Sequence, residues 1–286
     1  MQAEEIRQGV ASELLTCPEG FAVVKSYLLI VAMLYAGAVS AEVPTGDDYL
    51  VPRFRAGQTF SNVFSILRSM KADGYDEHVS RNGGSADDTV LSIRPSAWRF
   101  SSTWRYDGQA GGHDEEELRD GGRTYCSVNV GAQDKCSPYL EASGLTYNPT
   151  LWGVPPKQVI QGMKWNVDLK QAWELGGKNG TQMVTVIRVD PLTDTVTLMR
   201  EGTSEGGFSE SDANTIQLSH ADQTEKFDIV PGASHWKGYT TFVKGIVFSD
   251  ELLVTRSDVL HAKNGKTVNA IERRIMLLNS SPFPTL

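Results

Sequence analysis

The sequence lacks the features that identify several large classes of protein. It has no run of lysines and arginines, and its net charge is −8, so nucleic acid is not an expected partner. It has three cysteines and five histidines, and none of them stands at a spacing typical of a zinc site. Its most apolar run, residues 27–39, holds thirteen residues without a charge, fewer than the ~20 that a membrane-spanning helix needs. We therefore expect no metal, no other cofactor and no retained transmembrane helix.

The apolar run matches the hydrophobic region of a secretory signal peptide, which is ~7–15 residues long. Lys25 precedes it, and Val39-Ser40-Ala41 fits the small-x-small cleavage pattern. We expect residues 1–41 to be a leader that is cleaved near Ala41, which makes the mature protein periplasmic or secreted. Residues 1–24 hold four glutamates and one arginine, so translation could instead start at Val23 or Val24. A retained anchor or a buried helix is the alternative interpretation of the run.

Two cysteines, Cys126 and Cys136, remain once the leader is removed. In an oxidising compartment such a pair forms a disulfide, here closing a short loop. Two free thiols, or a metal pair, are the alternatives, and no nearby Cys or His completes a metal site.

Alternation of apolar and polar residues with a period of two predicts β-strands over most of the mature chain. The clearest examples are residues 98–106 and 164–175, and residues 236–249 predict another long strand that bends at its glycines. Residues 58–71 fit both a helix and a strand, and we interpret them as a strand. Asn179-Gly180 and Asn264-Gly265 predict hairpins, because a type I′ turn needs positive φ at both central positions.

This pattern predicts a mainly β fold with few helices, an antiparallel meander that forms a barrel, a half-barrel or a sandwich. The β-rich domain is expected over residues 42–280, either as one unit or as two halves joined by a Pro-rich linker near residues 138–158. Residues 281–286 are predicted to be a disordered tail.

One segment resembles a catalytic motif. "GTSEG", at residues 202–206, fits the G-x-S-x-G nucleophile elbow, and the order Ser204, Asp212, His220 is that of a serine hydrolase. An elbow needs a helix directly after the nucleophile, whereas residues 207–214 are rich in Gly, Ser and Asp. We therefore favour a surface loop and a non-catalytic protein, and keep a secreted serine hydrolase as the alternative.

The acidic segment at residues 111–122, "GGHDEEELRDGG", offers oxygen ligands for a divalent cation. It lacks the spacing of a calcium-binding loop, and charge runs are usually solvated, so we interpret it as an exposed loop.

Aromatic residues gather on the apolar sides of two predicted strands. They either fill a solid core or line a cavity for a hydrophobic ligand, and the candidates are Trp98, Phe100, Trp104, Tyr106, Trp165 and Trp173. The sequence thus favours an exported binding or structural module of the cell envelope or the extracellular space. Its partner would be a lipid, another hydrophobic small molecule or an envelope protein. An outer-membrane barrel is disfavoured, because the tryptophans run throughout the apolar faces and not only at their ends.

Overall fold

The computed structural model describes residues 49–128, 133–139, 144–156, 158–170, 179–207, 214–221 and 223–282. All of them belong to one compact unit, Val43–Leu286. The predicted leader, residues 1–41, lies outside these ranges and stays a prediction.

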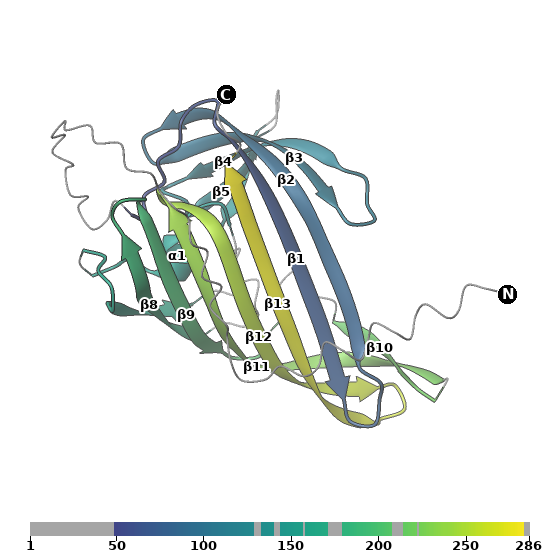
Figure 1. Ribbon diagram of the computed structural model, residues 1–286. Coiled ribbons are helices and arrows are strands. Elements are labelled where there is room, and N and C mark those ends of the chain that lie inside the picture. The colour runs from purple at the N-terminus through teal and green to yellow at the C-terminus, as the bar shows by residue number, and fades with distance from the viewer. Residues whose placement is uncertain are drawn as a thin grey trace, which may run out of the picture. The chain divides into compact units, whose positions relative to one another are not determined.

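The described chain forms one antiparallel sheet of 13 strands and one short helix, as the sequence predicted (Figure 1). The elements, in chain order, are β1 (Thr59–Ala72), β2 (His78–Arg94), β3 (Ala97–Tyr106), β4 (Gly112–Arg119), β5 (Thr124–Val128), β6 (Lys135–Pro138), α1 (Pro149–Trp152), β7 (Lys164–Leu169), β8 (Gly180–Asp190), β9 (Thr195–Ser204), β10 (Thr215–His220), β11 (Gln223–Val243), β12 (Ile246–Ala262) and β13 (Thr267–Pro282).

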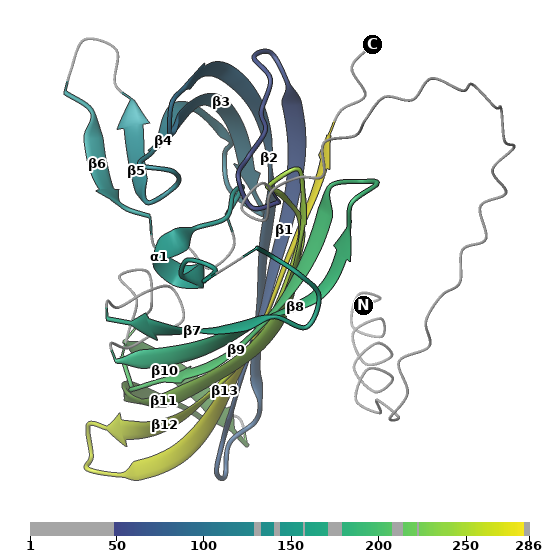
Figure 2. The ribbon, with the colours of Figure 1, turned by 90° about the vertical axis from the view of Figure 1, so that its left-hand side faces the viewer.

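The strand order across the sheet is β6-β5-β4-β3-β2-β1-β13-β12-β11-β9-β8-β7, and β10 pairs with the first part of β11. The sheet curves strongly, and its two ends bend toward the side on which α1 lies (Figure 2). Within the described residues β6 and β7 do not pair with each other, so the sheet is open, as in a half-barrel.

The two faces of the sheet differ in burial. The inner face, on the side of α1, carries every second residue of each strand, and β7 shows the rule with buried Trp165, Val167 and Leu169 between exposed polar neighbours. Leu151 and Trp152 of α1 pack on this face, and with β7–β9, β11, β12 and β13 they form the largest cluster of buried apolar side chains. The outer face carries the intervening residues.

The first and last strands of the sheet domain are neighbours. β1 and β13 pair antiparallel from Phe60↔Pro282 to Ala72↔Ala270. This pairing joins an N-terminal half, β1–β6, to a C-terminal half, β7–β13, within one continuous sheet (Figure 1).

The ambiguous segment at residues 58–71 is strand β1, which confirms the strand interpretation. The acidic segment at residues 111–122, in contrast, is not a loop, because Gly112–Arg119 form strand β4. Its charges alternate across the sheet, so that Asp114 and Glu116 lie on the inner face and Glu115 and Glu117 on the outer face. Both faces of this strand carry acidic side chains, so the sequence shows no alternation of apolar and polar residues that would predict a strand.

Residues 236–249 were predicted as one strand, and this was wrong, because a tight turn at Lys244-Gly245 separates β11 from β12. Both turn residues have positive φ, 54° and 75°, the type I′ pattern. The turn lies against the segment before β1, where a Cβ on Gly245 would come within 2.2 Å of the Val51 carbonyl oxygen. At Asn264-Gly265 the predicted hairpin is present, but only Gly265 has positive φ, so the turn is not of type I′.

The Pro-rich segment near residues 138–158 contributes to the core. Asn148 caps α1, with its side chain accepting a hydrogen bond from the Thr150 amide, and Tyr147 joins the same buried cluster as Trp152. At the other end of the domain, β13 includes Ser281 and Pro282, the first two residues of the predicted tail, and residues 283–286 lie outside the described ranges.

Candidate functional site

A cavity of about 400 Å³ opens on the inner face of the N-terminal half. Strands β1–β5 form its floor and sides, and Tyr139, Gly144 and Leu145 lie over it. We call it the inner-face cavity.

Aromatic rings line one side of this cavity. The ring centroids of Phe64 and Tyr106 are 5.6 Å apart, and those of Trp104 and Tyr106 are 5.2 Å apart. Two glycines on neighbouring strands make room for these rings. A Cβ on Gly84 would lie 2.7 Å from the Phe64 ring, and one on Gly112 would lie 2.3 Å from the Trp104 ring. The two glycines therefore let the Phe64 and Trp104 rings approach the backbone of the neighbouring strand closely.

Acidic groups of β2 and β4 line the cavity beside these rings. Asp88 and Glu116 are withdrawn from solvent, whereas Asp114 is exposed at the mouth of the cavity. Each accepts a hydrogen bond from an uncharged group: Asp88 from the Asn62 amide nitrogen, Asp114 from Trp104 Nε1 at 2.6 Å, and Glu116 from Tyr125. Burial, and next the charge of Asp88, raises the pKa of Glu116 to about 7, and burial likewise raises the pKa of Asp88.

The inner face of the C-terminal half also carries acids, but these are paired with arginines. Glu272 Oε2 lies 2.8 Å from both Arg68 and Arg256, and its other oxygen accepts from Arg274. Arg256 also bonds Asp258 at 2.8 Å, and Arg200 bonds buried Asp250 at 2.8 Å. These groups hold the sheet together through mutually satisfied charges and leave little capacity for a ligand.

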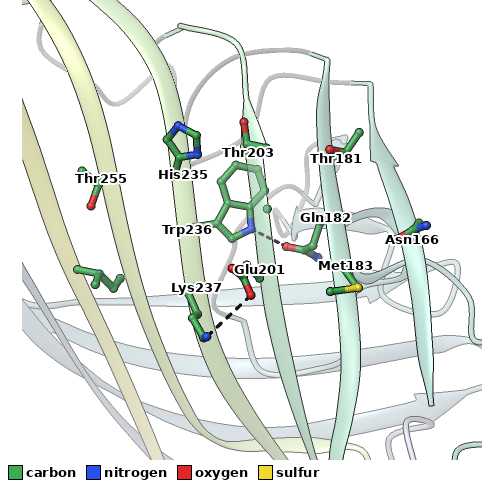
Figure 3. Close-up of a pocket in the computed structure, with 12 residues that line it drawn as sticks. Asn166, Thr181, Gln182, Met183, Glu201, Thr203, His235, Trp236, Lys237 and Thr255 are labelled. Carbon is green, nitrogen blue, oxygen red and sulfur yellow. Dashed lines mark hydrogen bonds and ion pairs between the residues drawn. The ribbon is translucent and has the colours of Figure 1, made fainter. Parts of the chain in front are cut away.

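A second hollow, of about 470 Å³, lies on the outer face over β7, β8, β9, β11 and β12. Figure 3 shows one contact on this face, with Lys237 lying 3.8 Å from Glu201. It also shows the Trp236 indole donating to Gln182 at 2.8 Å, but both of these side chains are buried on the inner face, where Gln182 donates to the Leu151 carbonyl of α1. Thr181, Thr203 and Thr255 border it, and it is more open than the inner-face cavity, so it would enclose a ligand less completely.

The structure distributes the six aromatic candidates among several places. Phe100, Trp104 and Tyr106 line the inner-face cavity. Trp98 is buried with Phe54 and Leu118 in an adjoining cluster. Trp165 belongs to the main core, where its indole donates to the Trp152 carbonyl at 2.6 Å, and Trp173 lies outside the described residues.

Sequence reasoning missed the polar side of the cavity, namely Asn62, Asp88, Asp114 and Glu116. The available signal was the alternation in "HDEEEL", which places two acids of β4 beside the aromatic face of β3 through the pairs Phe100↔Glu116 and Ser102↔Asp114.

The candidate hydrolase residues are placed as follows. Ser204 is the last residue of β9, is buried, and pairs with Ser234 of β11. His220 is exposed at the end of β10, and Asp212 lies outside the described residues. The hydrolase alternative therefore stays a prediction.

The disulfide predicted between Cys126 and Cys136 is present and joins β5 to β6. It lies on the outer face, where Cys126 is buried beside Glu117 of β4. Glu117 is itself paired with Arg94 and Arg119. The bond thus fixes the outermost strands of the half that contains the inner-face cavity.

Among the described residues, no helix has the length and apolar character needed to cross a membrane.

Neither a protein-family model nor a curated protein matches the chain. Solved structures give only weak likenesses. A LolA superfamily protein from Nitrosomonas europaea is 10% identical with a TM-score of 0.23, covering 85% of this chain and 95% of its own. An outer membrane channel from Pseudomonas putida is 9% identical with a TM-score of 0.19, covering 84% and 100%. A porin variant from Rh. blastica is 9% identical with a TM-score of 0.22, covering 76% and 99%. Scores this low do not establish a shared fold.

Proposed function

We propose that this protein is an exported, non-catalytic binding protein of the cell envelope or the extracellular space, and that it holds an amphipathic small molecule in the inner-face cavity. The observation that carries the proposal is the cavity itself, an opening of about 400 Å³ where a sheet this strongly curved could have had a solid core. Its aromatic side offers apolar surface and its acidic side offers hydrogen-bond acceptors.

Two features support export. The sequence predicts a cleaved signal peptide over residues 1–41, and the Cys126–Cys136 disulfide is the kind of bond that persists in an oxidising compartment.

The test has two parts. Native mass spectrometry of protein purified from its own host would reveal a co-purified small molecule and report whether cleavage occurs near Ala41. Independently, the neutral dye 1-N-phenylnaphthylamine should gain fluorescence on binding the purified protein. Trp104→Ala should weaken dye binding, because it removes a ring from the cavity.

A matched pair of variants controls for nonspecific effects. Tyr106 and Tyr239 are both strand tyrosines of similar exposure, 46% and 43%, but Tyr239 lies on the outer face. Dye binding should fall in Tyr106→Ala and be unchanged in Tyr239→Ala. Equal effects of the two variants, or a protein that binds neither dye nor any co-purified molecule, would contradict the proposal.

A further inference from the structure

The acids of the inner-face cavity have no basic partner within the described residues. Asp88, Asp114 and Glu116 form no ion pair there, although Glu115 and Glu117 of the same strand β4 are paired with arginines on the outer face. The inner-face acids of the C-terminal half are paired as well. A buried carboxylate without a counter-charge is costly, so the exception at the cavity requires a reason.

A second, independent group points to the same kind of ligand. Asn62 lines the cavity and is only 8% exposed. Its amide nitrogen donates to Asp88, and its carbonyl oxygen is buried without a hydrogen-bond partner. Buried acceptors are rarely left without a donor, and this one lies beside carboxylates that can only accept when ionised. The donors of the cavity are already bonded to its carboxylates, so the Asn62 carbonyl oxygen is an acceptor without a donor.

The aromatic side complements a positive charge. The face of an indole or phenol ring attracts a cation, and Phe64, Trp104 and Tyr106 present rings to the same space. The protein already uses such a contact elsewhere, because the Arg200 guanidinium lies 4.6 Å from the centre of the Trp152 ring.

From these three observations we propose that the ligand of the inner-face cavity is an amphipathic amine. Its ammonium N–H groups would donate to Asn62, Asp88 and Glu116, and its apolar body would lie against the rings of Phe64, Trp104 and Tyr106. This inference rests on the proposed function and specifies the chemical class of the ligand. An ammonium supplies the missing charge and the missing donors together, whereas a quaternary cation would supply only the charge.

The test uses a series of ligands that share one ring system and differ in one group. Four ligands are titrated into the purified, exported protein by calorimetry at pH 8: 1-naphthylmethylamine, its N,N,N-trimethyl derivative, 1-naphthylmethanol and the carboxylate 1-naphthaleneacetate. The amine should bind at least about tenfold more tightly than the alcohol, which corresponds to one charge-assisted contact. The trimethyl derivative should fall between them, and the acetate should bind most weakly.

Variants then locate the contact. Glu116→Gln should reduce the preference for amine over alcohol about tenfold, and Asn62→Leu should reduce the preference for the amine over its trimethyl derivative. Glu115→Gln, on the outer face of the same strand, is the matched control and should leave both preferences unchanged. Circular dichroism confirms that each variant is folded.

The outcomes separate the two proposals. If the alcohol and the acetate bind as tightly as the amine, the cavity binds ligands but the amine inference is wrong. If none of the four ligands binds, the proposed function fails with it. The ligand series is measured on the unaltered protein. Its result therefore tests the inference even if one of the variants does not fold.

Discussion

The two halves of the inner face carry acidic residues of the same kind in opposite situations. In the C-terminal half, Glu272 contacts Arg68, Arg256 and Arg274, and these ion pairs link β1, β12 and β13. In the N-terminal half, Glu116 and Asp88 meet only uncharged donors beside an open cavity. The comparison shows that burial of a charge alone does not identify a site. What distinguishes the cavity is the absence, among the described residues, of the partner that the other half provides.

The pKa values of Glu272 and Glu116 differ in the same sense, although burial raises the pKa of paired Asp258 as well. Burial would raise the pKa of Glu272, but the arginines around it, Arg274 first, outweigh burial and hold the pKa below its ordinary value. For Glu116 nothing outweighs burial, and the pKa rises.

The largest effect is expected from breaking the paired half. Glu272→Gln leaves three arginines without their shared counter-charge and should lower the free energy of unfolding at pH 7 by about 3 kcal/mol, measured by urea denaturation. Because the folded pKa of Glu272 is lowered, its contribution is present above the unfolded pKa and disappears as pH falls through the folded value. Glu251→Gln, exposed on the outer face of β12, should change stability little. A loss below about 1 kcal/mol for Glu272→Gln would mean that the ion pairs of Glu272 contribute little to the stability of the protein.

The next effect concerns the edge of the cavity half. Replacing both Cys126 and Cys136 by Ser should cost about 2–3 kcal/mol, because the unfolded chain regains the freedom of the loop that the bond closes. Dye binding should weaken as well, since β5 contributes Tyr125 to the cavity. The dithiothreitol-reduced protein should match the double variant in both measurements. Unchanged dye binding would show that the cavity does not depend on this edge.

Glu116→Gln should stabilise the protein, the opposite of Glu272→Gln. A raised folded pKa means that stability falls as pH rises from the ordinary carboxyl value toward about 7. The variant should therefore gain about 1 kcal/mol at pH 8, a value reduced for partial exposure, and nothing at pH 4. Thermal unfolding at the two pH values measures this. Destabilisation at pH 8 would place Glu116 among the structural acids.

Amine binding should strengthen as pH rises through about 7, by a few-fold between pH 6 and pH 8. The ionised form of Glu116 is the one that accepts from an ammonium, and the groups that face it are Asp88 of β2, Asp114 of β4 and Tyr125 of β5. Naphthylmethanol should show no such trend. A flat profile for the amine would remove Glu116 from the contact.

The smallest effect is expected at Ser204. Ser204→Ala should leave ligand binding unchanged and should not alter hydrolysis of p-nitrophenyl esters, because the hydroxyl is buried in strand β9. Loss of a hydrolytic activity in this variant would favour the secreted hydrolase instead.

The sequence predicted the fold class because most strands display an apolar face, as at residues 98–106. The sequence-based prediction was wrong where a strand or a turn lacked this alternation of apolar and polar residues. Strand β4 alternates charge with charge, so its period was hidden. The β11–β12 turn uses Lys-Gly where Asn-Gly was sought, and Lys244 is held in its positive φ by contacts that no local pattern reveals: its amide donates to the Asp194 carbonyl and its carbonyl accepts from the Arg53 amide. Half of the aromatic candidates line the cavity, but the acids beside them became visible only once β2, β3 and β4 were in register.

The pairing of β1 with β13 has a consequence for how the chain is made. β1 is the first strand in the chain and β13 the last, so more than 200 residues must be synthesised before β1 gains this partner. Until then the edges of β1 and β12 both expose unpaired backbone groups, the condition under which strands add to the wrong neighbour. Contacts this distant in sequence also form slowly. The chain is therefore most prone to aggregation before β13 is made, when a chaperone that covers the edges of β1 and β12 would protect it.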